Sequence, residues 1–414
     1  MKHLMQTMRN HRAFKVLHYR DFRLVTYGQI FGNLGFWMDE LSRGWLIYQL
    51  TDSMVQLGLA RGVQFVPLLL FAPFAGSAAD RYSRKTLLLF SQAANGCLFA
   101  ALAVLIYNGM VQPWHVYLTA VLVGMMQVIQ QPARTSLVCD TVPPEYLTNA
   151  IGLTSLIFNG ARLAGPALAG VIIAFSDTSG AFAVQALCLF MATLWTAQLR
   201  PLLLPPEDTA KARRETFVHS IVEGWKFAWR NEAVRSGITC TTIVSMLIFP
   251  FTALLPVFAR DLLGVGASGQ GMLLAAMGFG ALISAAIITV AGHRLPRGKV
   301  ILGSSVIYGL LVVAFSASPW FGLSLALMVV IGLCHVHANA LVHTVVQTYS
   351  SAEYRGRTMA LFNMSQMLNT AGSMIIGVLA VALGPRGAVA AMGMAGALAI
   401  VALAVFVPGA RRIK

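Results

Sequence analysis

Acidic and basic side chains lie close together within an apolar stretch near the start of the chain. Asp39 and Glu40 fall in the segment 23–50, and Arg43 follows Asp39 at the spacing that places two residues on one face of a helix. An ionisable side chain inside a membrane costs about 2.5–3.5 kcal/mol on insertion scales, so such residues are usually paired and functional. Arg61, in the next apolar stretch, and Arg162, in the fifth, add two cations.

These two acids and three bases can neutralise one another in alternative pairings. A carboxylate beside a cation stays ionised, whereas the same carboxylate binds a proton once the cation has moved away and the surroundings are apolar. We therefore predict a proton-coupling role for Asp39, Glu40, Arg43, Arg61 and Arg162. A static set of ion pairs that holds the first, second and fifth spans together would explain the same residues.

Polar side chains also recur in other apolar stretches that we expect to surround a central cavity. A few amides in a mostly apolar pocket could orient a small molecule, although hydrogen bonds between helices explain any single one equally well. We predict that the cavity contains Gln29, Asn33, Trp37, Gln127, Gln131, Asn159, His335, Asn339, Asn363 and Gln366.

Three histidines crowd the tenth apolar stretch, but they do not suggest a metal site. His335, His337 and His343 are separated by two and by six residues, so they do not share one helical face. Because histidine titrates near neutrality, His335 is a secondary candidate for carrying a proton. The five cysteines follow no repeating spacing, and we find no Walker loop and no nucleophile–base constellation. We expect no metal, no cofactor and no enzymatic activity.

The composition indicates a membrane protein that is built from helices. Charged residues make up 11% of the 414 positions and hydrophobic residues 57%, against about 25% charged in soluble chains. The apolar runs are continuous, whereas strands of an outer-membrane barrel alternate. A helix needs roughly 20 apolar residues to span a bilayer. We predict an all-α polytopic membrane protein with twelve transmembrane helices: 23–50, 55–79, 87–108, 115–136, 148–174, 181–200, 234–259, 268–292, 300–318, 320–346, 357–383 and 386–407.

The distribution of positive charge predicts the orientation of the chain. The formal net charge is +15, but most of the 30 Lys and Arg residues fall in the two termini, the long polar segment and alternate short loops. This pattern fits the positive-inside rule better than a nucleic-acid surface. We predict a bacterial inner-membrane location with both termini cytoplasmic. The loop cations include Arg81, Arg84, Lys85, Arg134, Arg294, Arg297 and Lys299.

The two halves of the chain resemble each other at matched places. Pro113-Trp114 and Pro319-Trp320 open the fourth and tenth spans, and Glu145-Tyr146 and Glu353-Tyr354 precede the fifth and eleventh. We predict two pseudo-symmetric six-helix bundles, 1–200 and 234–414, joined by a cytoplasmic linker, 201–233. In the linker, 217–229 could form an interfacial amphipathic helix. Transporters built from such repeats hold substrate near the midplane.

The loop after the second span carries the most specific motif. It reads Gly76-Ser-Ala-Ala-Asp80-Arg81-Tyr-Ser-Arg84-Lys85, and it resembles the loop motif of the major facilitator superfamily. The resemblance implies a gating role for Gly76, Asp80, Arg81, Arg84 and Lys85. In the second half His293 stands where the acid would be, which puts an equivalent gate there in doubt. A loop that is basic only because it faces the cytoplasm is the simpler alternative.

Two further segments narrow the resemblance. Gly165-Pro166, with Gly170, in span five resembles the Gly-Pro motif of exporters in the superfamily, although Ala169 replaces an expected glycine. Tight helix packing alone would also explain it. With the first span and Pro132-Ala-Arg134, the motif looks like the branch of enterobactin exporters and macrolide efflux pumps. The resemblance covers nearly the whole chain.

That resemblance implies an exporter of amphipathic small molecules, such as drugs or siderophores, driven by protons. We expect the protein to be a monomer. The expected partners are a small-molecule substrate, protons and the lipid bilayer, with no nucleic acid. Two other functions remain open: a carrier that takes up a nutrient or metabolite, and a membrane sensor that does not transport. The direction of accumulation separates the first two, and absence of flux under a gradient would favour the third.

Overall fold

The computed structural model describes residues 12–64, 67, 83–200, 217–291, 296–351 and 353–412. Every regular element in these ranges is a helix, which confirms the all-α class. Eight helical segments within them are long and apolar enough to cross a membrane. Helix α2 (Arg20–Thr51) is not among the eight, because its polar and charged side chains lower its mean hydropathy.

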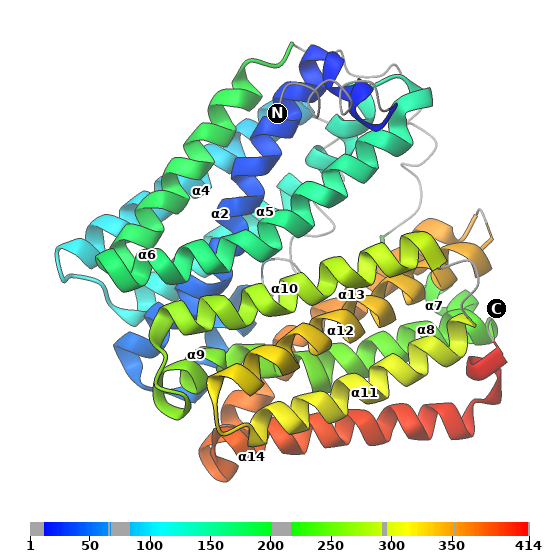
Figure 1. Ribbon diagram of the computed structural model, residues 1–414. Helices are drawn as coiled ribbons and strands as arrows, with labels where there is room; N and C mark the ends of the chain where they lie inside the picture. The colour runs from blue at the N-terminus through cyan, green and yellow to red at the C-terminus, as the bar shows by residue number, and fades with distance from the viewer. Residues whose placement is uncertain are drawn as a thin grey trace, which may run out of the picture. The chain divides into compact units, whose positions relative to one another are not determined.

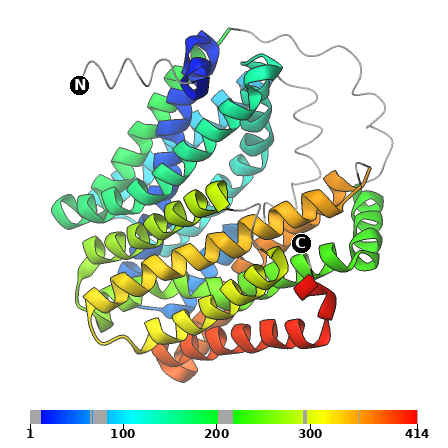
Figure 2. The same ribbon diagram turned by 45° about the vertical axis from the view of Figure 1, so that its right-hand side comes forward.

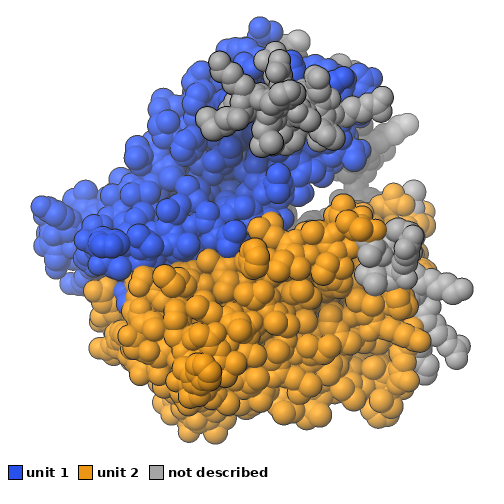
Figure 3. All heavy atoms as spheres, viewed as in Figure 1, with its two compact units in different colours: residues 1–46, 63–206 blue, residues 47–62, 207–414 orange. Residues whose placement is uncertain are grey.

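The chain forms two compact units, which are coloured separately in Figure 3. Unit 1 contains residues 1–46 and 63–206, and unit 2 contains residues 47–62 and 207–414. Helix α2 therefore begins in unit 1 and ends in unit 2. This division differs from the predicted halves at 47–62, which the prediction placed with the first six spans.

Long helices make up unit 1 (Figure 1). After α2, helix α4 packs against both α5 and α6. Ser83 begins α4 as its N-cap, because its hydroxyl accepts a hydrogen bond from the Thr86 amide at 3.1 Å. The elements are η1 (Arg12–His18), α2, α4 (Arg84–Tyr107), α5 (Pro113–Asp140), η2 (Pro144–Tyr146) and α6 (Leu147–Ala197).

Helix α6 contains two of the predicted spans. It breaks at Asp177, where φ is 72° and ψ is 174°. Residues other than glycine rarely adopt this backbone conformation. The break falls between the fifth and sixth spans, which the sequence predicts at 148–174 and 181–200.

Unit 2 contains the remaining helices. In both ribbon views α11 lies beside α12, and α12 also packs against α10 (Figure 2). The elements are α7 (Phe217–Arg230), α8 (Glu232–Ile243), η5 (Val244–Ile248), η6 (Phe249–Leu254), α9 (Leu255–Val257), η7 (Phe258–Leu262), α10 (Gly266–Ala291), α11 (Arg297–Ala317), α12 (Phe321–Tyr349), α13 (Arg355–Met367), α14 (Asn369–Phe406) and η9 (Pro408–Arg412).

Two of these helical segments are irregular. The segment from α8 to η7 changes between α, π and 3-10 turns around Pro250 and Pro256, because proline removes a backbone donor and crowds the preceding turn. Helix α14 breaks at Gly384, where φ is 72°. That break separates the eleventh and twelfth predicted spans. The count of twelve stays a prediction, since most of the second span, 55–79, lies outside the described residues.

Large apolar side chains are exposed on both units. Phe175 is 88% exposed, Val290 77% and Phe406 81%. Surfaces of this kind would aggregate in water, whereas the hydrocarbon of a bilayer solvates them. The exposed apolar residues therefore agree with the membrane-spanning helices.

The linker contributes one described helix, α7, whose two sides differ. Gly224 packs against the backbone of Arg357, and the ring of Phe227 stacks on that of Tyr354 with the centroids 4.8 Å apart. Trp225 and Trp229 are about half exposed and stack on each other. The expected helix is thus present, and its contact with a bilayer stays a prediction.

Candidate functional site

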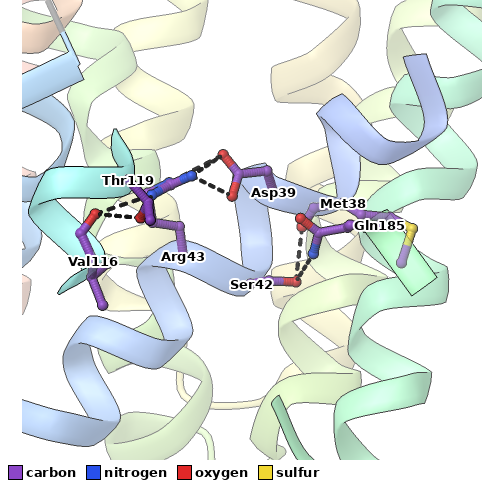
Figure 4. Close-up of polar contacts among 7 residues, drawn as sticks. All are labelled: Met38, Asp39, Ser42, Arg43, Val116, Thr119 and Gln185. Carbon is purple, nitrogen blue, oxygen red and sulfur yellow. Dashed lines mark hydrogen bonds and ion pairs between the residues drawn. The ribbon is translucent and has the colours of Figure 1, made fainter. Parts of the chain in front are cut away.

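Asp39 and Arg43 form a buried ion pair inside α2. They lie one turn apart, and the relative exposure is 8% for Asp39 and 4% for Arg43. The Arg43 Nε and Nη2 atoms both donate to Asp39 Oδ2 at 3.1 Å, and Nη2 lies 3.0 Å from Oδ1 (Figure 4). Both hydrogen bonds thus go to one carboxylate oxygen, and each is strengthened by the charges of the two groups. The expected pairing of Asp39 with Arg43 is present.

The remaining donor of Arg43 fastens the pair to α5. Arg43 Nη1 donates to the Val116 carbonyl and to Thr119 Oγ1, both at 3.1 Å. The guanidinium also lies 6.0 Å from the centre of the Phe99 ring on α4. Arg43 therefore keeps neutral partners of its own, whatever the charge of Asp39.

The other side of α2 is held against α6. Gln185 Nε2 donates to Ser42 Oγ at 3.0 Å, and Ser42 donates to the Met38 carbonyl at 3.0 Å (Figure 4). A Cβ added at Gly165 would lie 2.6 Å from Trp37 Cβ, so this glycine allows the two helices to approach closely. Pro166 and Gly170 are buried in the same helix. Within unit 1, the span-five motif thus packs α6 on α2.

The structure places Arg162 beside an aromatic cluster. Its guanidinium lies 5.3 Å from the ring centre of Trp37. Phe36 and Phe158 each contact that ring edge-on, with centroids 5.4 Å away. Arg162 thus makes a cation–π contact on the α6 side of α2, where the Trp37 face attracts the cation.

A cleft opens beside the Asp39 carboxylate. It encloses about 340 Å³ of empty space, part of it open to solvent. At one end Arg134 Nη1 donates to Asn33 Oδ1 at 2.7 Å. The cleft lies among α2, α4, α5 and α6 and is lined by Gly32, Phe36, Asp39, Asn95, Phe99, Val123, Gln127, Gln130, Arg134 and Leu189.

The other predicted cavity residues of unit 1 lie in different surroundings. Gln29 is buried, and neither atom of its amide has a hydrogen-bond partner among the described residues. Gln131 is exposed, whereas its neighbour Gln130 lines the cleft. Asn159 donates to the Ser155 carbonyl of its own helix at 2.8 Å. The cleft therefore includes Gln127 but not Gln131 or Asn159.

The predicted cavity residues of unit 2 form a separate set. The His335 ring packs between those of Phe249 and Tyr308, with centroid distances of 4.8 and 5.5 Å. Asn339 Nδ2 donates to Gln366 Oε1 at 3.3 Å, which joins α12 to α13. Asn363 is exposed.

The other two histidines of α12 contact neighbouring helices. His337 hydrogen-bonds Ser284 at 2.7 Å, and the His343 ring contacts Phe362 edge-on. The described residues contain no group of three His, Cys, Asp or Glu side chains that could hold a metal ion.

The predicted gating and coupling residues are only partly described. Gly76, Asp80 and Arg81 lie outside the described residues. Arg84 forms an ion pair with Asp140, and Lys85 Nζ donates to the Leu199 carbonyl. These contacts tie the start of α4 to the ends of α5 and α6. Glu40 is partly buried on α2 in unit 1, and Arg61 belongs to unit 2.

Sequence reasoning missed three residues of the site. Asn95 is one of two amides, with Gln92, in the mostly apolar helix α4, and Thr119 resembles any helix-packing threonine. Arg134 was counted with the cytoplasmic loop charges, yet it lies within α5 and lines the same cleft as Asp39. Its position inside the predicted span 115–136 was the signal that could have identified it.

Comparison with known proteins agrees with this architecture. A protein of Staphylococcus aureus named staphyloferrin A transporter is 26% identical over 355 residues, which cover 84% of this chain and 86% of that protein. The multidrug efflux pump Tap of Mycolicibacterium fortuitum is 23% identical and matches 94% of this chain and 96% of its own. Macrolide efflux protein A of Streptococcus pyogenes is 20% identical over 76% of this chain and 79% of its own.

Solved structures show the same fold at low identity. A mutant of the nucleoside transporter NupG has a TM-score of 0.73 at 12% identity, covering 94% of this chain and 99% of its own. A bacterial homologue of the human lysosomal transporter Spinster, inward-facing and occupied, has a TM-score of 0.73 at 17% identity over 96% and 97%.

The family described as transmembrane secretion effector matches residues 12–411, which is nearly the whole chain. The relatives named above are transporters of the major facilitator superfamily. The polytopic helical fold agrees with this match. The chain therefore belongs to the transmembrane secretion effector family of major facilitator transporters.

Proposed function

We propose that the protein is a proton-driven exporter that moves amphipathic small molecules out of the cell by alternating access. The observation that carries the proposal is the buried Asp39–Arg43 pair beside an open cleft. The named activities of two relatives, multidrug and macrolide efflux, support export. We further propose a monomer in the bacterial inner membrane with both termini in the cytoplasm.

The pair offers a simple coupling reaction. A proton that binds Asp39 removes its negative charge and weakens its bonds to Arg43. Arg43 then keeps its bonds to Val116 and Thr119, so no cation is left without a partner. When the proton leaves, the ion pair re-forms. One proton thereby exchanges two states of the Asp39–Arg43 pair.

The free energy needed to break the Asp39–Arg43 pair is comparable to the free energy that one entering proton supplies. Breaking a buried ion pair by removing one partner costs about 3–5 kcal/mol. One charge that crosses a potential of about 100 mV supplies about 2.3 kcal/mol, and each pH unit of gradient adds about 1.4 kcal/mol. The bonds that Arg43 retains lower the cost below that of an unpaired charge, so one proton can drive the rearrangement.

The substrate is identified first, with a growth panel. Cells with and without the gene are compared on toxic compounds and siderophores. An exporter lowers accumulation of the active compound in the cell, whereas an uptake carrier raises it. The absence of any flux under a gradient would favour a sensor.

Reconstituted vesicles then test the coupling. The variants Asp39→Asn and Glu40→Gln are compared with the wild type for flux of the identified compound, with and without a pH gradient. We expect at least one variant to equilibrate the compound downhill but to fail to concentrate it. If both variants pump normally against the gradient, neither residue carries the proton, and His335 becomes the next candidate. An equal fall of uphill and downhill flux, with lower stability, would indicate a static ion pair instead.

A further inference from the structure

Among the described residues that line the cleft beside Asp39, Arg134 is the cation. Its partner among the described side chains is the neutral amide of Asn33, at 2.7 Å. Other described arginines have carboxylate partners: Arg43 has Asp39, Arg84 has Asp140, and Arg260 has Asp52 and Asp261. Within the described part of unit 1, Arg134 therefore adds a positive charge to the cleft that no acid neutralises.

The contacts of α2 and α5 show the direction in which the cleft runs. These helices are antiparallel, because Arg43 bonds to Val116 and Thr119 near the start of α5, whereas Asn33 bonds to Arg134 near its end. The cleft thus extends from Asp39 toward the start of α2 and the end of α5. Under the orientation that we propose, this is the cytoplasmic side.

Three amides line the otherwise mostly apolar wall between Asp39 and Arg134. Gln127 and Gln130 line it from α5, and Asn95 lines it from α4. Asn95 is 4% exposed, and its Oδ1 has no hydrogen-bond partner among the described residues. A buried amide oxygen without a partner is costly, and a water molecule that donates to it removes the cost.

We infer that this cleft is the path by which the proton of Asp39 leaves to the cytoplasm, through water held by Asn95, Gln127 and Gln130. The inference deepens the proposed function and rests on its proton coupling. Arg134 is a positioning residue here: its positive charge favours the ionised carboxylate and thus release of the proton into this cleft. Release on the cytoplasmic side is the direction that an exporter driven by proton entry requires.

The other charged groups around Asp39 do not replace this role. On α2, Arg43 is the direct partner of Asp39, and Glu40 is the adjacent residue. On α6, Arg162 lies over Trp37. The residues that α4 contributes to the cleft wall, Asn95 and Phe99, are both neutral. Arg134 is the cation that lies along the cleft.

Infrared spectroscopy of the purified full-length protein tests the inference without any substrate. The band of the protonated Asp39 carboxyl is identified as the one absent from Asp39→Asn. We expect Arg134→Gln to move the midpoint of its titration to higher pH by about one unit, because the carboxyl then holds its proton more tightly. Arg134→Lys keeps the charge and should restore the midpoint. Arg20→Gln, at the exposed start of α2, is the matched control and should leave it unchanged.

A second variant tests the water path itself. Asn95→Leu places an apolar side chain in the cleft, so after a jump in pH the Asp39 band should change at least tenfold more slowly. The midpoint of Asn95→Leu should stay near that of the wild type. An unchanged rate in Asn95→Leu, or an unchanged midpoint in Arg134→Gln, would overturn the inference. A wild type with no Asp39 band and no proton flux would instead refute the proposed coupling at Asp39.

Discussion

Arg260 Nη2 lies 2.5 Å from Asp52 Oδ1, and the same guanidinium donates from Nε to Asp261 Oδ1 at 2.8 Å. The Tyr48 hydroxyl donates to the other oxygen of Asp261, and Arg260 lies 4.2 Å from the centre of the Tyr48 ring. Asp52 has a φ of 47°, which is uncommon for a residue other than glycine. These bonds join 47–62 to residues 260–261 of unit 2, and Gly58 also packs against the Ser373 backbone of that unit.

The first prediction concerns this network. Arg260→Gln should remove the ion pair that holds residues 47–62 to Arg260. Amide hydrogen exchange in 52–58 should therefore accelerate at least tenfold. The loss of global stability should stay below about 1 kcal/mol, because the partners are 35–70% exposed and surface ion pairs contribute little. Arg386→Gln, an exposed arginine of the same unit, is the control. Unchanged exchange in 52–58 would show that packing alone holds the segment.

The second prediction is a double-mutant cycle on Asp39 and Arg43. Arg43→Gln leaves a buried carboxylate without its cation and should cost about 3–5 kcal/mol of stability. The double variant Asp39→Asn with Arg43→Gln should be less destabilised than Arg43→Gln alone, since no charge is left unpaired. The measurement is the unfolding temperature in detergent, with Arg20→Gln as the control. Additive effects would mean that the two residues do not interact.

The third prediction compares two glycines of α6. Gly165→Ala should destabilise the protein by about 1–3 kcal/mol, because its Cβ would lie 2.6 Å from Trp37 Cβ. Gly160→Ala is the matched control: no described atom lies within 4 Å of its added Cβ, and alanine favours a helix. The measurement is the unfolding temperature of both variants. Equal unfolding temperatures would contradict the close approach of α2 and α6.

The fourth prediction concerns the loop between the second and third spans. Asp80→Asn should slow transport while leaving substrate binding nearly intact, because we expect this loop to bias the conformational equilibrium rather than to form the pocket. Flux in vesicles and binding to the purified protein are measured on the same preparation. If binding falls as much as flux, the loop does not have that role.

The fifth prediction concerns the two breaks at φ 72°. Asp177→Gly should raise the free energy of unfolding by about 1–3 kcal/mol, since glycine adopts this backbone without strain. Gly384→Ala should lower it by about 1–2 kcal/mol for the same reason. No described atom lies within 4 Å of the added Cβ at Gly384, so crowding does not confuse the result. The unfolding temperature should rise in Asp177→Gly and fall in Gly384→Ala. A change in the same direction in both variants would refute the argument.

Hydropathy predicted the fold better than it predicted the site. Continuous apolar runs and turn residues are local signals, so the breaks expected at 174–181 and 383–386 contain Asp177 and Gly384. The site depends on which face of a helix a residue occupies. Gln130 and Gln131 are neighbours, yet a step of one residue turns about 100° around the axis and moves the second side chain out of the cleft.

Partners across helices were the hardest to foresee. Asp39 and Arg43 could be paired from their spacing within one helix. The bonds of Arg134 to Asn33 and of Arg260 to Asp52 join residues that are far apart in the sequence, and no local pattern encodes them. The contact of Arg162 with Trp37 was also not foreseen, because an aromatic face can be a partner for a cation as well as an acid can.

At the breaks in α6 and α14, no loop separates the two helical arms that are joined. In each case a single residue turns the chain, so the two arms of the helix cannot slide past each other or separate. The facing ends of the two arms at each corner therefore stay one residue apart, and the φ and ψ of that residue set the angle between the arms.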